Sequence, residues 1–462
     1  MSVLLPTPES REMSMGKQGE KQEREFWIVA DEVAEAPGRP FYERLNSILQ
    51  KQGFDQHVHE VCAKFYKDGG RPSIPPPVYF RMLMLGYFEG LSSERAIAWH
   101  CADSRSLGQF LGFKLTEKTP DHSSLSRIRS RIDQETHEEL FSWALRALAG
   151  EGLLSGKTIG VDATTLEANA AMRGIVRRDT GEKYDEYLTR LAKESGIETP
   201  TREDLIKLDR KRKNKASNDD WESPNDSDAR IAKMKDGSTH LAHKAEHAVD
   251  MDSGAVLAVT LQHADLGDTT TIYQTVTQAT ENLEELAQDP RCEKKLNPYV
   301  EAVVTDKGYH SNEVLTAHAD AEIRTYISEP GRGERNWEEK AREQKAVHGN
   351  RRRIKGNRGK KLLRRRGELV ERSFAHCYET GAMRRIHLIG HANILKRLLL
   401  HIAAFNLSLI LRKHFGCGTP REMANAGKSI IFGVFAVMGA YSARYQRHDC
   451  KNTFEPLLQT AA

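Results

Sequence analysis

Apolar residues recur every three or four positions through much of the first 150 residues, which is the spacing of one face of an α-helix. Helices are therefore predicted at Phe41–Lys51, Val78–Phe88, Ala96–His100, Leu107–Leu111, Leu125–Ile132 and Phe141–Glu151. Glycines and prolines break this pattern at Gly69–Pro77 (G-G-R-P-S-I-P-P-P). Residues 1–25 are polar and lack periodicity, so we expect a disordered tail there. Residues 26–150 are expected to form an all-helical N-terminal domain.

The hydrophobic period shortens after residue 150. Runs that are β-branched, or that alternate apolar and polar residues, predict strands at Lys157–Asp162, His240–Asp250, Ala255–His263, Glu301–Asp306 and Ile323–Ser328. The turn sequence D-S-G at 252–254 predicts that the second and third of these strands form a hairpin. Helical spacing returns at Thr269–Gln288 and Asn312–His318. This order of strands and helices predicts a mixed α/β domain over residues 151–415.

The C-terminal part contains two apolar segments. Leu388–Leu411 includes Lys396, Arg397 and His401, and Ile430–Tyr441 is too short to cross a bilayer. Both are predicted to be core helices, and residues 416–462 are expected to form a C-terminal helical extension and tail. The N-terminus lacks the basic start and apolar stretch of a secretory signal, and the six cysteines are scattered without a C-x-x-C pair. We therefore expect a cytoplasmic protein with no membrane partner.

The net charge of +4 is small, but the charges are unevenly distributed. Residues 172–237 are a charge-dense insertion with little to bury, so we expect them outside the core, with a helix at Lys183–Glu194. Between Lys345 and Arg366 there are eleven Lys or Arg residues and no Asp or Glu. This basic segment, residues 345–366, has the charge pattern of a phosphate-binding surface, although a solvated helix face has the same pattern.

The last predicted helix before residue 133 is also basic. The loop Thr119–Ser124 would cap it, and it carries Arg127, Arg129 and Arg131. A series of short helices ending in a basic helix is helix-turn-helix-like and suits DNA contact. A plain helical bundle with ordinary surface arginines fits the periodicity equally well.

Three carboxylates stand out by position. Asp306 ends the apolar run A-V-V-T and is followed by the turn residue Gly308, and Asp162 ends the first predicted strand. Glu371 lies early in an apparent helix after the basic segment. A single Asp at a strand end is more often a turn former or a helix cap. Three such acids together fit a site in which carboxylates hold two Mg²⁺ or Mn²⁺ ions for phosphoryl transfer.

Other polar clusters give weaker signals. On a helix, the spacing of His240, His243 and His247 would place three imidazoles near one face, with His263 further along the chain, as in a metal site. This stretch alternates like a strand, which would scatter the histidines over both faces, so a histidine metal site is not favoured. Turn or surface roles are favoured for three further acids, Asp228, Asp250 and Asp265.

The acidic motifs resemble those of a known enzyme family. V-V-T-D-K-G-Y-H-S around Asp306 resembles the second acidic motif of the bacterial insertion-sequence DDE transposases of the IS4/IS5 superfamily. G-V-D-A-T-T-L-E-A-N-A around Asp162 resembles the first motif, and G-E-L-V-E-R-S-F-A-H around Glu371 resembles the third. L-S-S-E-R at 91–95 and T-P-D-H-S at 119–123 are similar to the N-terminal part of that group. The resemblance spans about Tyr42 to Phe415 and is nearest to the IS1182-like branch.

This resemblance implies an RNase H-like catalytic core, with a mixed sheet flanked by helices and with Asp162 and Asp306 on neighbouring strands. It implies that Asp162, Asp306 and Glu371 are the catalytic acids and hold two Mg²⁺ (or Mn²⁺) ions. The implied substrate is double-stranded DNA, both the terminal inverted repeats of the element and the target, bound by a homodimer in the nucleoid. The N-terminal arginines would read the ends, and the basic segment would hold the backbone through Arg351, Arg352, Arg353, Lys355, Arg358, Lys360, Lys361, Arg364, Arg365 and Arg366.

The third motif departs from the family pattern at two positions. Many relatives have an Arg four residues before the Glu and a Lys seven residues after it, where this chain has Gly367 and Tyr378. Glu368, one helical turn before Glu371, is the alternative third acid. Two alternative functions remain open, a catalytically silent DNA-binding derivative of a transposase and an RNase H-like DNA nuclease.

Overall fold

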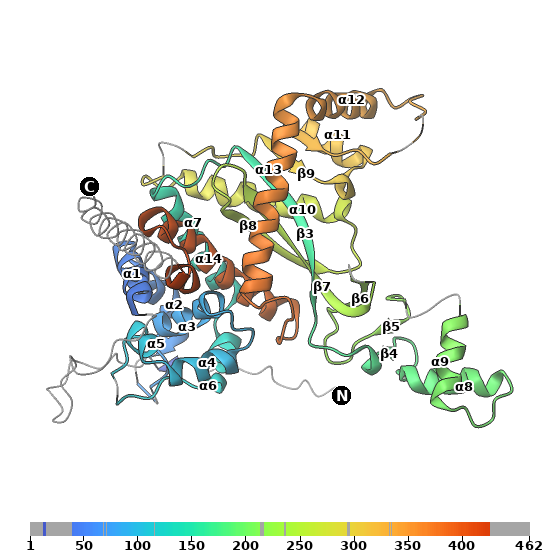
Figure 1. Cartoon of the computed structure of the whole chain (residues 1–462), viewed down its shortest axis with the longest axis horizontal. Coiled ribbons are helices and arrows are strands. Elements are labelled where there is room, and N and C mark those ends of the chain that lie inside the picture. The colour runs from blue at the N-terminus through green and yellow to red at the C-terminus, as the bar shows by residue number, and fades with distance from the viewer. Residues whose placement is uncertain are drawn as a thin grey trace, which may run out of the picture.

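The computed structural model describes residues 13–14 and 39–425, except residues 68, 71, 115, 213–216, 235–236, 293–295, 332 and 334. A mixed β-sheet with helices on its faces stands at the centre, and a group of helices packs at one side of it (Figure 1). The predicted α/β class is therefore confirmed. Within residues 1–25, strand β1 (Met13–Ser14) pairs with β2 (Tyr66–Lys67), so these two positions are not the disordered tail that we expected. The rest of that tail, and the predicted helix Ile430–Tyr441, lie outside the described residues.

The helical group contains the N-terminal elements. In chain order these are α1 (Arg39–Lys51), α2 (Phe54–Cys62), η2 (Ala63–Phe65), α3 (Pro76–Phe88), α4 (Glu94–Asp103), α5 (Arg105–Phe110), α6 (His122–Arg131) and α7 (Gln134–Gly150). Helices α4 to α7 each begin after a side chain that accepts a hydrogen bond from a backbone N–H of the first turn, namely Ser93, Ser104, Asp121 and Asp133. Helix α2 was not predicted from the sequence. Its Phe54, Val58 and Cys62 nevertheless have helical spacing and lie on one buried face.

The central sheet has the strand order β10-β9-β3-β7-β6, and β8 also pairs with β7. Its strands are β3 (Thr158–Glu167), β6 (Arg230–Lys233), β7 (Thr239–Asp250), β8 (Val256–His263), β9 (Ala302–Thr305) and β10 (Arg324–Ile327). Strands β3 and β10 run parallel to β9, whereas β7 is antiparallel to β3, β6 and β8. The predicted hairpin at 252–254 is confirmed. The predicted end of the first strand at Asp162 is wrong, because β3 continues to Glu167 by pairing with β7.

Helices cover both faces of the sheet. They are η4 (Lys307–Tyr309), α10 (Asp268–Ala287), α11 (Asn312–Asp320), α12 (Ala341–Lys355), α13 (Asn357–Phe374) and the π-helix η5 (Ala375–Thr380). Helix α13 crosses the face that carries Gly160, since Val370 lies against that glycine. Helix α10 covers the other face, where its Thr271 and Thr275 donate hydrogen bonds to the buried Glu246. Helices α11 and α12 pack beside β10 at the far end of the sheet (Figure 1).

Helix α14 (His391–Phe415) joins the helical group to the sheet. The Asn406 side chain donates to the Val256 carbonyl at 2.9 Å and accepts from the Val256 N–H at 3.0 Å, so the helix covers the edge strand β8. Lys396 donates to the carbonyls of Arg129 and Ile132 at the C-terminal end of α6. One continuous hydrophobic core therefore runs through the helical group and the sheet.

The burial of α14 also decides how its apolar sequence is interpreted. The segment His391–Asn425 could cross a membrane by its length and composition alone. Its most apolar window is 89% buried inside the protein, which is the environment of a core helix. This agrees with the core helix predicted at Leu388–Leu411.

The charged insertion projects away from the rest of the molecule (Figure 1). Its elements are η3 (Met172–Gly174), β4 (Val176–Arg177), α8 (Tyr184–Glu194), α9 (Arg202–Lys211) and β5 (Trp221–Glu222). Trp221 is buried and packs edge-on against Tyr184 and Tyr187, with ring centroids 4.9 and 5.2 Å away. This small cluster is separate from the main core, so the insertion has little apolar surface to hold it in one orientation.

His137 makes the stability of the helical group dependent on pH. It is buried, its Nδ1 donates to the Asp133 carbonyl at 2.8 Å, and burial lowers its pKa to about 4. Below pH 6.5 the unfolded chain takes up a proton on this imidazole, whereas the folded protein does not until about pH 4. The unfolding free energy should therefore fall as the pH drops through this window.

We expect His137→Gln to remove part of that pH dependence. Urea unfolding at pH 7 and pH 5 should show that the wild type loses about 2 kcal/mol more than the variant over this range. Equal losses in the two proteins would show that His137 is protonated in the folded state as easily as in the unfolded state.

Candidate active site

Asp162 and Asp306 lie at the same level on neighbouring strands. Strands β3 and β9 are parallel, and their register pairs Gly160 with Val304. Strand β9 ends at Thr305, and continuing the register by two residues places Asp306, the next residue, level with Asp162. Because side chains alternate along a strand, both carboxylates lie on the same face as Gly160 and Val304. The fold therefore brings two of the three predicted acids together, at the point where β9 ends.

Asp162 is half-buried and already has a cationic partner. Its Oδ2 accepts a hydrogen bond from Nη1 of Arg366 at 2.7 Å, and its Oδ1 accepts from the Ala163 N–H at 2.9 Å. Burial raises the pKa of Asp162, the nearby Asp306 carboxylate raises it further, and the Arg366 guanidinium opposes both effects. The electrostatic coupling of the two aspartates agrees with their placement side by side.

The motif after β9 fixes Asp306 through several contacts. Oδ1 of Asp306 accepts from the Gly308 N–H at 2.8 Å, so Asp306 is indeed a helix cap, the role that a single Asp at a strand end most often has. A Cβ at Gly308 would lie 2.7 Å from Oδ2 of Asp268, so only glycine fits there without a shift. The Tyr309 hydroxyl is buried and donates to Glu246 at 2.7 Å. These contacts hold the turn, and with it the carboxylate, against the sheet.

Helix α13 lies close to β3 because β3 has a glycine at the crossing. A Cβ at Gly160 would lie 2.8 Å from Sδ of Met251 and 3.0 Å from Cγ2 of Val370. Any larger side chain would push α13 away from the sheet. The close approach is what allows Arg366, one turn before Val370, to reach Asp162.

Glu371 and Leu369 lie on opposite flanks of α13. Leu369 and Glu371, the residues before and after Val370, project to opposite flanks, each about 100° from it. Leu369 packs against Gly254 in the β7–β8 turn, at the end of the sheet where β3 begins. Glu371 therefore projects to the other flank, whereas Glu368 is about 160° from Val370 and points away from the sheet.

Among the described residues, the third predicted acid does not contact the other two. The Glu371 side chain is exposed and lies along α13 toward Gly367, 3.9 Å from where a Cβ would be. In the part of the chain that the structure describes, no group of three or more His, Cys, Asp or Glu side chains is arranged to hold a metal ion. The choice of Glu371 over Glu368 as the third acid therefore stays a prediction.

The end of α13 is tied to the strand beside Asp162. His247 lies opposite Asp162 in the β3–β7 register. Its Nδ1 is 3.0 Å from the hydroxyl of Ser373 in α13, and its Nε2 is 2.6 Å from the hydroxyl of Tyr378 in η5. Tyr378 is therefore a buried anchor and cannot contact DNA at the position where relatives have a lysine. Burial lowers the pKa of His247 to about 3, so this anchor is neutral.

Five of the predicted DNA-contacting arginines have partners inside the protein. Arg129 pairs with Glu94, Arg351 pairs with Glu329, and Arg366 pairs with Asp162. Arg353 is half-buried and donates to Thr325, and Arg365 donates to the Asp252 carbonyl. Acids, carbonyls and hydroxyls distant in sequence engage these five arginines, and their contact with DNA stays a prediction. Arg366 is the clearest case, since 204 positions separate it from its partner.

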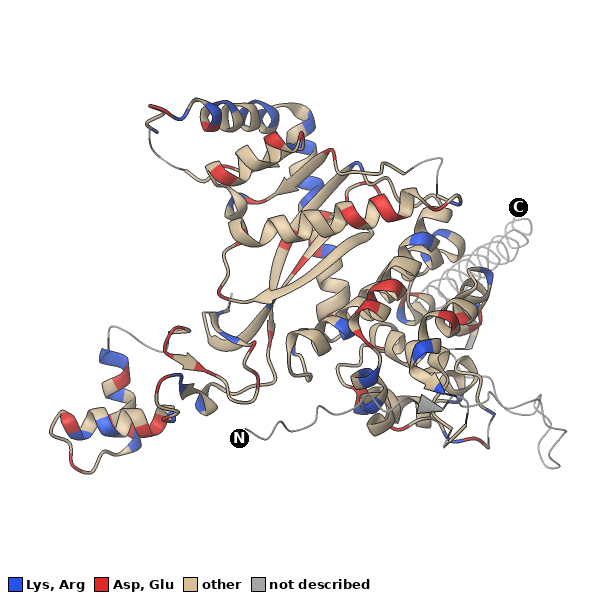
Figure 2. Ribbon diagram, turned by 180° about the vertical axis from the view of Figure 1, so that it is seen from behind, with Lys and Arg blue, Asp and Glu red and all other residues tan. Residues whose placement is uncertain are grey.

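The remaining basic residues form an exposed surface. Figure 2 shows Lys and Arg side by side along α12 and the start of α13. Among the described residues, none forms an ion pair or a side-chain hydrogen bond with the exposed Arg352, Lys355, Arg358, Lys360, Lys361 and Arg364. On α6, Arg131 is exposed, and the exposed Arg127 side chain donates hydrogen bonds to Ser123 and Ser124 of its own helix. These residues are available to a polyanion.

Two family comparisons agree with this geometry. Residues 31–131 match the model of the family described as "Transposase domain (DUF772)", and residues 182–407 match that of the "Transposase DDE domain". The chain is an insertion-sequence DDE transposase. No curated protein matches it. The central sheet is accordingly an RNase H-like core, and the transposase binds, cleaves and joins DNA in the manner of its family, which generally uses divalent metal ions.

The matched ranges cover the predicted acids unequally. Asp306 and Glu371 lie inside the DDE match, whereas Asp162 precedes its first residue, 182. The assignment of Asp162 therefore depends on its position beside Asp306 on the neighbouring strand. The N-terminal match ends at residue 131, which is also the last residue of α6.

The histidines of β7 and β8 serve the architecture of the transposase. His243 lies opposite His263, its Nε2 is 3.1 Å from Asp226, and its Nδ1 is 3.0 Å from Nε2 of His391. This network ties the end of the insertion to the start of α14. His247 instead contacts Ser373 and Tyr378, so the histidines do not share one site. Described residues elsewhere also form no such metal cluster.

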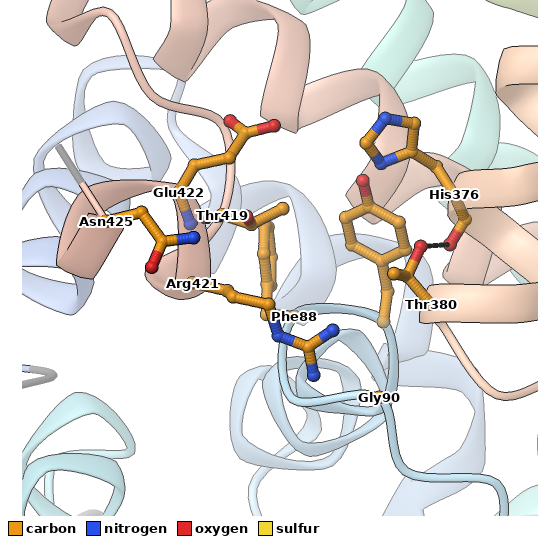
Figure 3. Close-up of a pocket in the computed structure, with 9 residues that line it drawn as sticks. Phe88, Gly90, His376, Thr380, Thr419, Arg421, Glu422 and Asn425 are labelled. Atoms are coloured by element: carbon orange, nitrogen blue, oxygen red, sulfur yellow. Dashed lines mark hydrogen bonds between the residues drawn. The ribbon is translucent and has the colours of Figure 1, made fainter.

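A separate hollow lies where the helical group meets η5 (Figure 3). Tyr87 and Phe88 of α3, His376 and Thr380 of η5, and Arg421 from the segment after α14 line it. The Thr380 hydroxyl donates to the His376 carbonyl at 3.2 Å. No predicted acid lines this hollow, so it is distinct from the site around Asp162.

Proposed function

We propose that the transposase cuts and joins DNA strands at a site formed by Asp162, Asp306 and Glu371. The observation that carries this proposal is that Asp162 and Asp306 lie side by side where β9 ends. The two carboxylates are close enough for Asp306 to raise the pKa of Asp162. Carboxylate oxygens are the ligands that Mg²⁺ and Mn²⁺ prefer, so the residues present fit such ions. Two ions bound there would stabilise charge on the attacking and leaving oxygens at phosphorus.

Different residues would bind the metal ions and the DNA backbone. Asp162 and Asp306 would hold the ions from the sheet, and Glu371 would complete their ligands from the flank of α13. Lys360 and Arg364 lie on the same stripe of α13 as Glu371, because spacings of four and seven residues return to one side of a helix. They would therefore hold a DNA backbone that passes toward the acids. The neutral anchor at His247 keeps α13 in place while DNA binds.

Recognition of the element would be a task of the helical group. Arg127 and Arg131 on the exposed side of α6 are suited to contact the terminal inverted repeats. Joining two ends to one target needs two active sites, so we propose a homodimer on DNA, working at the nucleoid in the cytoplasm. The pairing of the two matched domains is consistent with the IS1182-like branch.

The decisive assay follows DNA cleavage and joining. Purified protein is incubated with Mg²⁺ and a DNA that carries candidate element ends, and the products are separated by size. A transposase should cut at the ends and join the freed 3′-hydroxyl to target DNA. Cleavage without joining would identify an RNase H-like nuclease, and binding without cleavage would identify a silent derivative.

We expect the exposed cations of α13 to contribute directly to DNA affinity. In Lys360→Ala/Arg364→Ala, the slope of log affinity against log salt should fall by about 2, because each lost phosphate contact removes about 0.9. Arg351→Gln is the matched control, since its guanidinium pairs with Glu329. Fluorescence anisotropy over a range of salt concentrations measures the slopes. If Arg351→Gln lowers the slope as much as the double variant does, the exposed cations of α13 do not contribute more to DNA affinity than the paired Arg351.

A further inference from the structure

Arg366 forms a largely buried ion pair with Asp162, one of the two aspartates of the proposed site. The guanidinium lies at 2.7 Å from Oδ2 of Asp162, and the two side chains are only 14% and 23% exposed. Nε of Arg366 is buried without a hydrogen-bond partner among the described residues. Arg366 is therefore held at the acid pair mainly through one ion pair, and one of its own donors is left unsatisfied.

The acid pair needs a positive charge whether or not a metal ion is bound. Asp162 and Asp306 lie beside each other on the same face, so their charges repel. Arg366 places a positive charge against Asp162. Oδ1 of Asp162 already accepts the Ala163 N–H, so Oδ2, which Arg366 contacts, is the oxygen that faces a divalent ion most directly. The guanidinium and the ion therefore compete for one carboxylate.

We propose that Arg366 is a positioning residue that occupies the metal-binding oxygen of Asp162 in the DNA-free protein and leaves it when a divalent ion binds. This inference rests on the proposed role of Asp162 as a metal ligand. While the ion pair is formed, only the small fraction of molecules with an open Asp162 can bind the ion, so the apparent affinity is reduced by that fraction. Arg366 thus keeps the two aspartates in place and also weakens metal binding until the ion pair opens.

The test measures Mn²⁺ binding by electron paramagnetic resonance in the absence of DNA. Arg366→Met keeps the aliphatic stem that packs beside Gly160 and removes the guanidinium. We expect it to bind Mn²⁺ about tenfold more tightly than the wild type. Arg366→Lys keeps a cation and should remain near the wild-type affinity. Equal Mn²⁺ affinity in the wild type and Arg366→Met would overturn the proposal.

Two further variants separate this inference from the site on which it rests. Arg365→Met is the matched control, because its guanidinium contacts the Asp252 carbonyl, and its Mn²⁺ affinity should be unchanged. Asp162→Asn should abolish Mn²⁺ binding both alone and with Arg366→Met. If Asp162→Asn leaves binding intact, the proposed metal site is wrong. If it abolishes binding while Arg366→Met leaves the affinity at the wild-type value, the site stands and only the role of Arg366 is wrong.

Circular dichroism verifies that each variant is folded before titration. Should Arg366→Met not fold, Arg366→Gln replaces it, because a glutamine can still donate a hydrogen bond to Asp162 without carrying charge. The melting temperature gives a second readout. Without the guanidinium, Mn²⁺ should raise the melting temperature more than it does in the wild type. An equal rise in both proteins would also overturn the proposal.

Discussion

Replacing Asp306 with asparagine is expected to lower DNA cleavage at least about a thousandfold while DNA affinity stays within about twofold of the wild type. The loss follows from chemistry, since an amide is a poor ligand for Mg²⁺ and carries no charge. The fold should survive, because the amide oxygen can still accept the Gly308 N–H that Oδ1 of Asp306 accepts now. Cleavage of labelled end DNA and anisotropy of the same DNA measure the two quantities.

Asp320→Asn serves as the matched control for this experiment. Asp320 is an exposed residue of α11 that pairs with Arg342, so the same chemical change there should leave cleavage at the wild-type rate. The assay also separates the two candidate glutamates. Glu371→Gln should reproduce the loss, whereas Glu368→Gln should not, because Glu368 points away from the sheet. An Asp306→Asn protein that cuts at the wild-type rate would place the active site elsewhere.

Strands of the sheet could be predicted from the sequence where the residues within the strand or its turn determine the structure. The run A-V-V-T gave β9, and alternation with a D-S-G turn gave the β7–β8 hairpin, because burial and turn geometry act on neighbouring residues. Helix α2 had a comparable signal in Phe54, Val58 and Cys62. The end of β3 had none, because residues 163–167 are extended only through pairing with β7, which lies about eighty residues away.

In the candidate site too, contacts between residues close in sequence could be predicted, whereas contacts between residues distant in sequence could not. Asp306 could be identified from its own motif, since every contact that fixes its turn begins within three residues of it. The partners of the basic residues could not, because Arg366 finds Asp162 and Arg351 finds Glu329 only after the chain has folded. Charge density alone therefore does not show which basic residues have partners inside the protein. The exposed basic residues of α12 and α13 are the proposed DNA contacts.

Replacing Arg397 with leucine is expected to lower the unfolding free energy by roughly 3 kcal/mol. Arg397 comes from α14 and is buried, and its guanidinium donates to the carbonyls of Leu83 and Leu91 around the end of α3. Leucine would leave these buried groups short of a donor. Urea unfolding measures the change. Arg385→Leu is the control, because Arg385 is 61% exposed and the same substitution there should change stability by less than about 0.5 kcal/mol.

The space that Arg397 fills allows a stricter test of the same junction. A Cβ at Gly86 would lie 1.7 Å from Nη2 of Arg397, so Gly86→Ala should itself cost about 2 kcal/mol through overpacking. In the Arg397→Leu background that clash is gone, and the cost of Gly86→Ala should largely disappear. Additive effects of the two substitutions would mean that the guanidinium does not occupy this space. Strong coupling would establish that α3 and α14 pack as one unit, which would hold the helices proposed to read DNA in a fixed position relative to the sheet with the proposed acids.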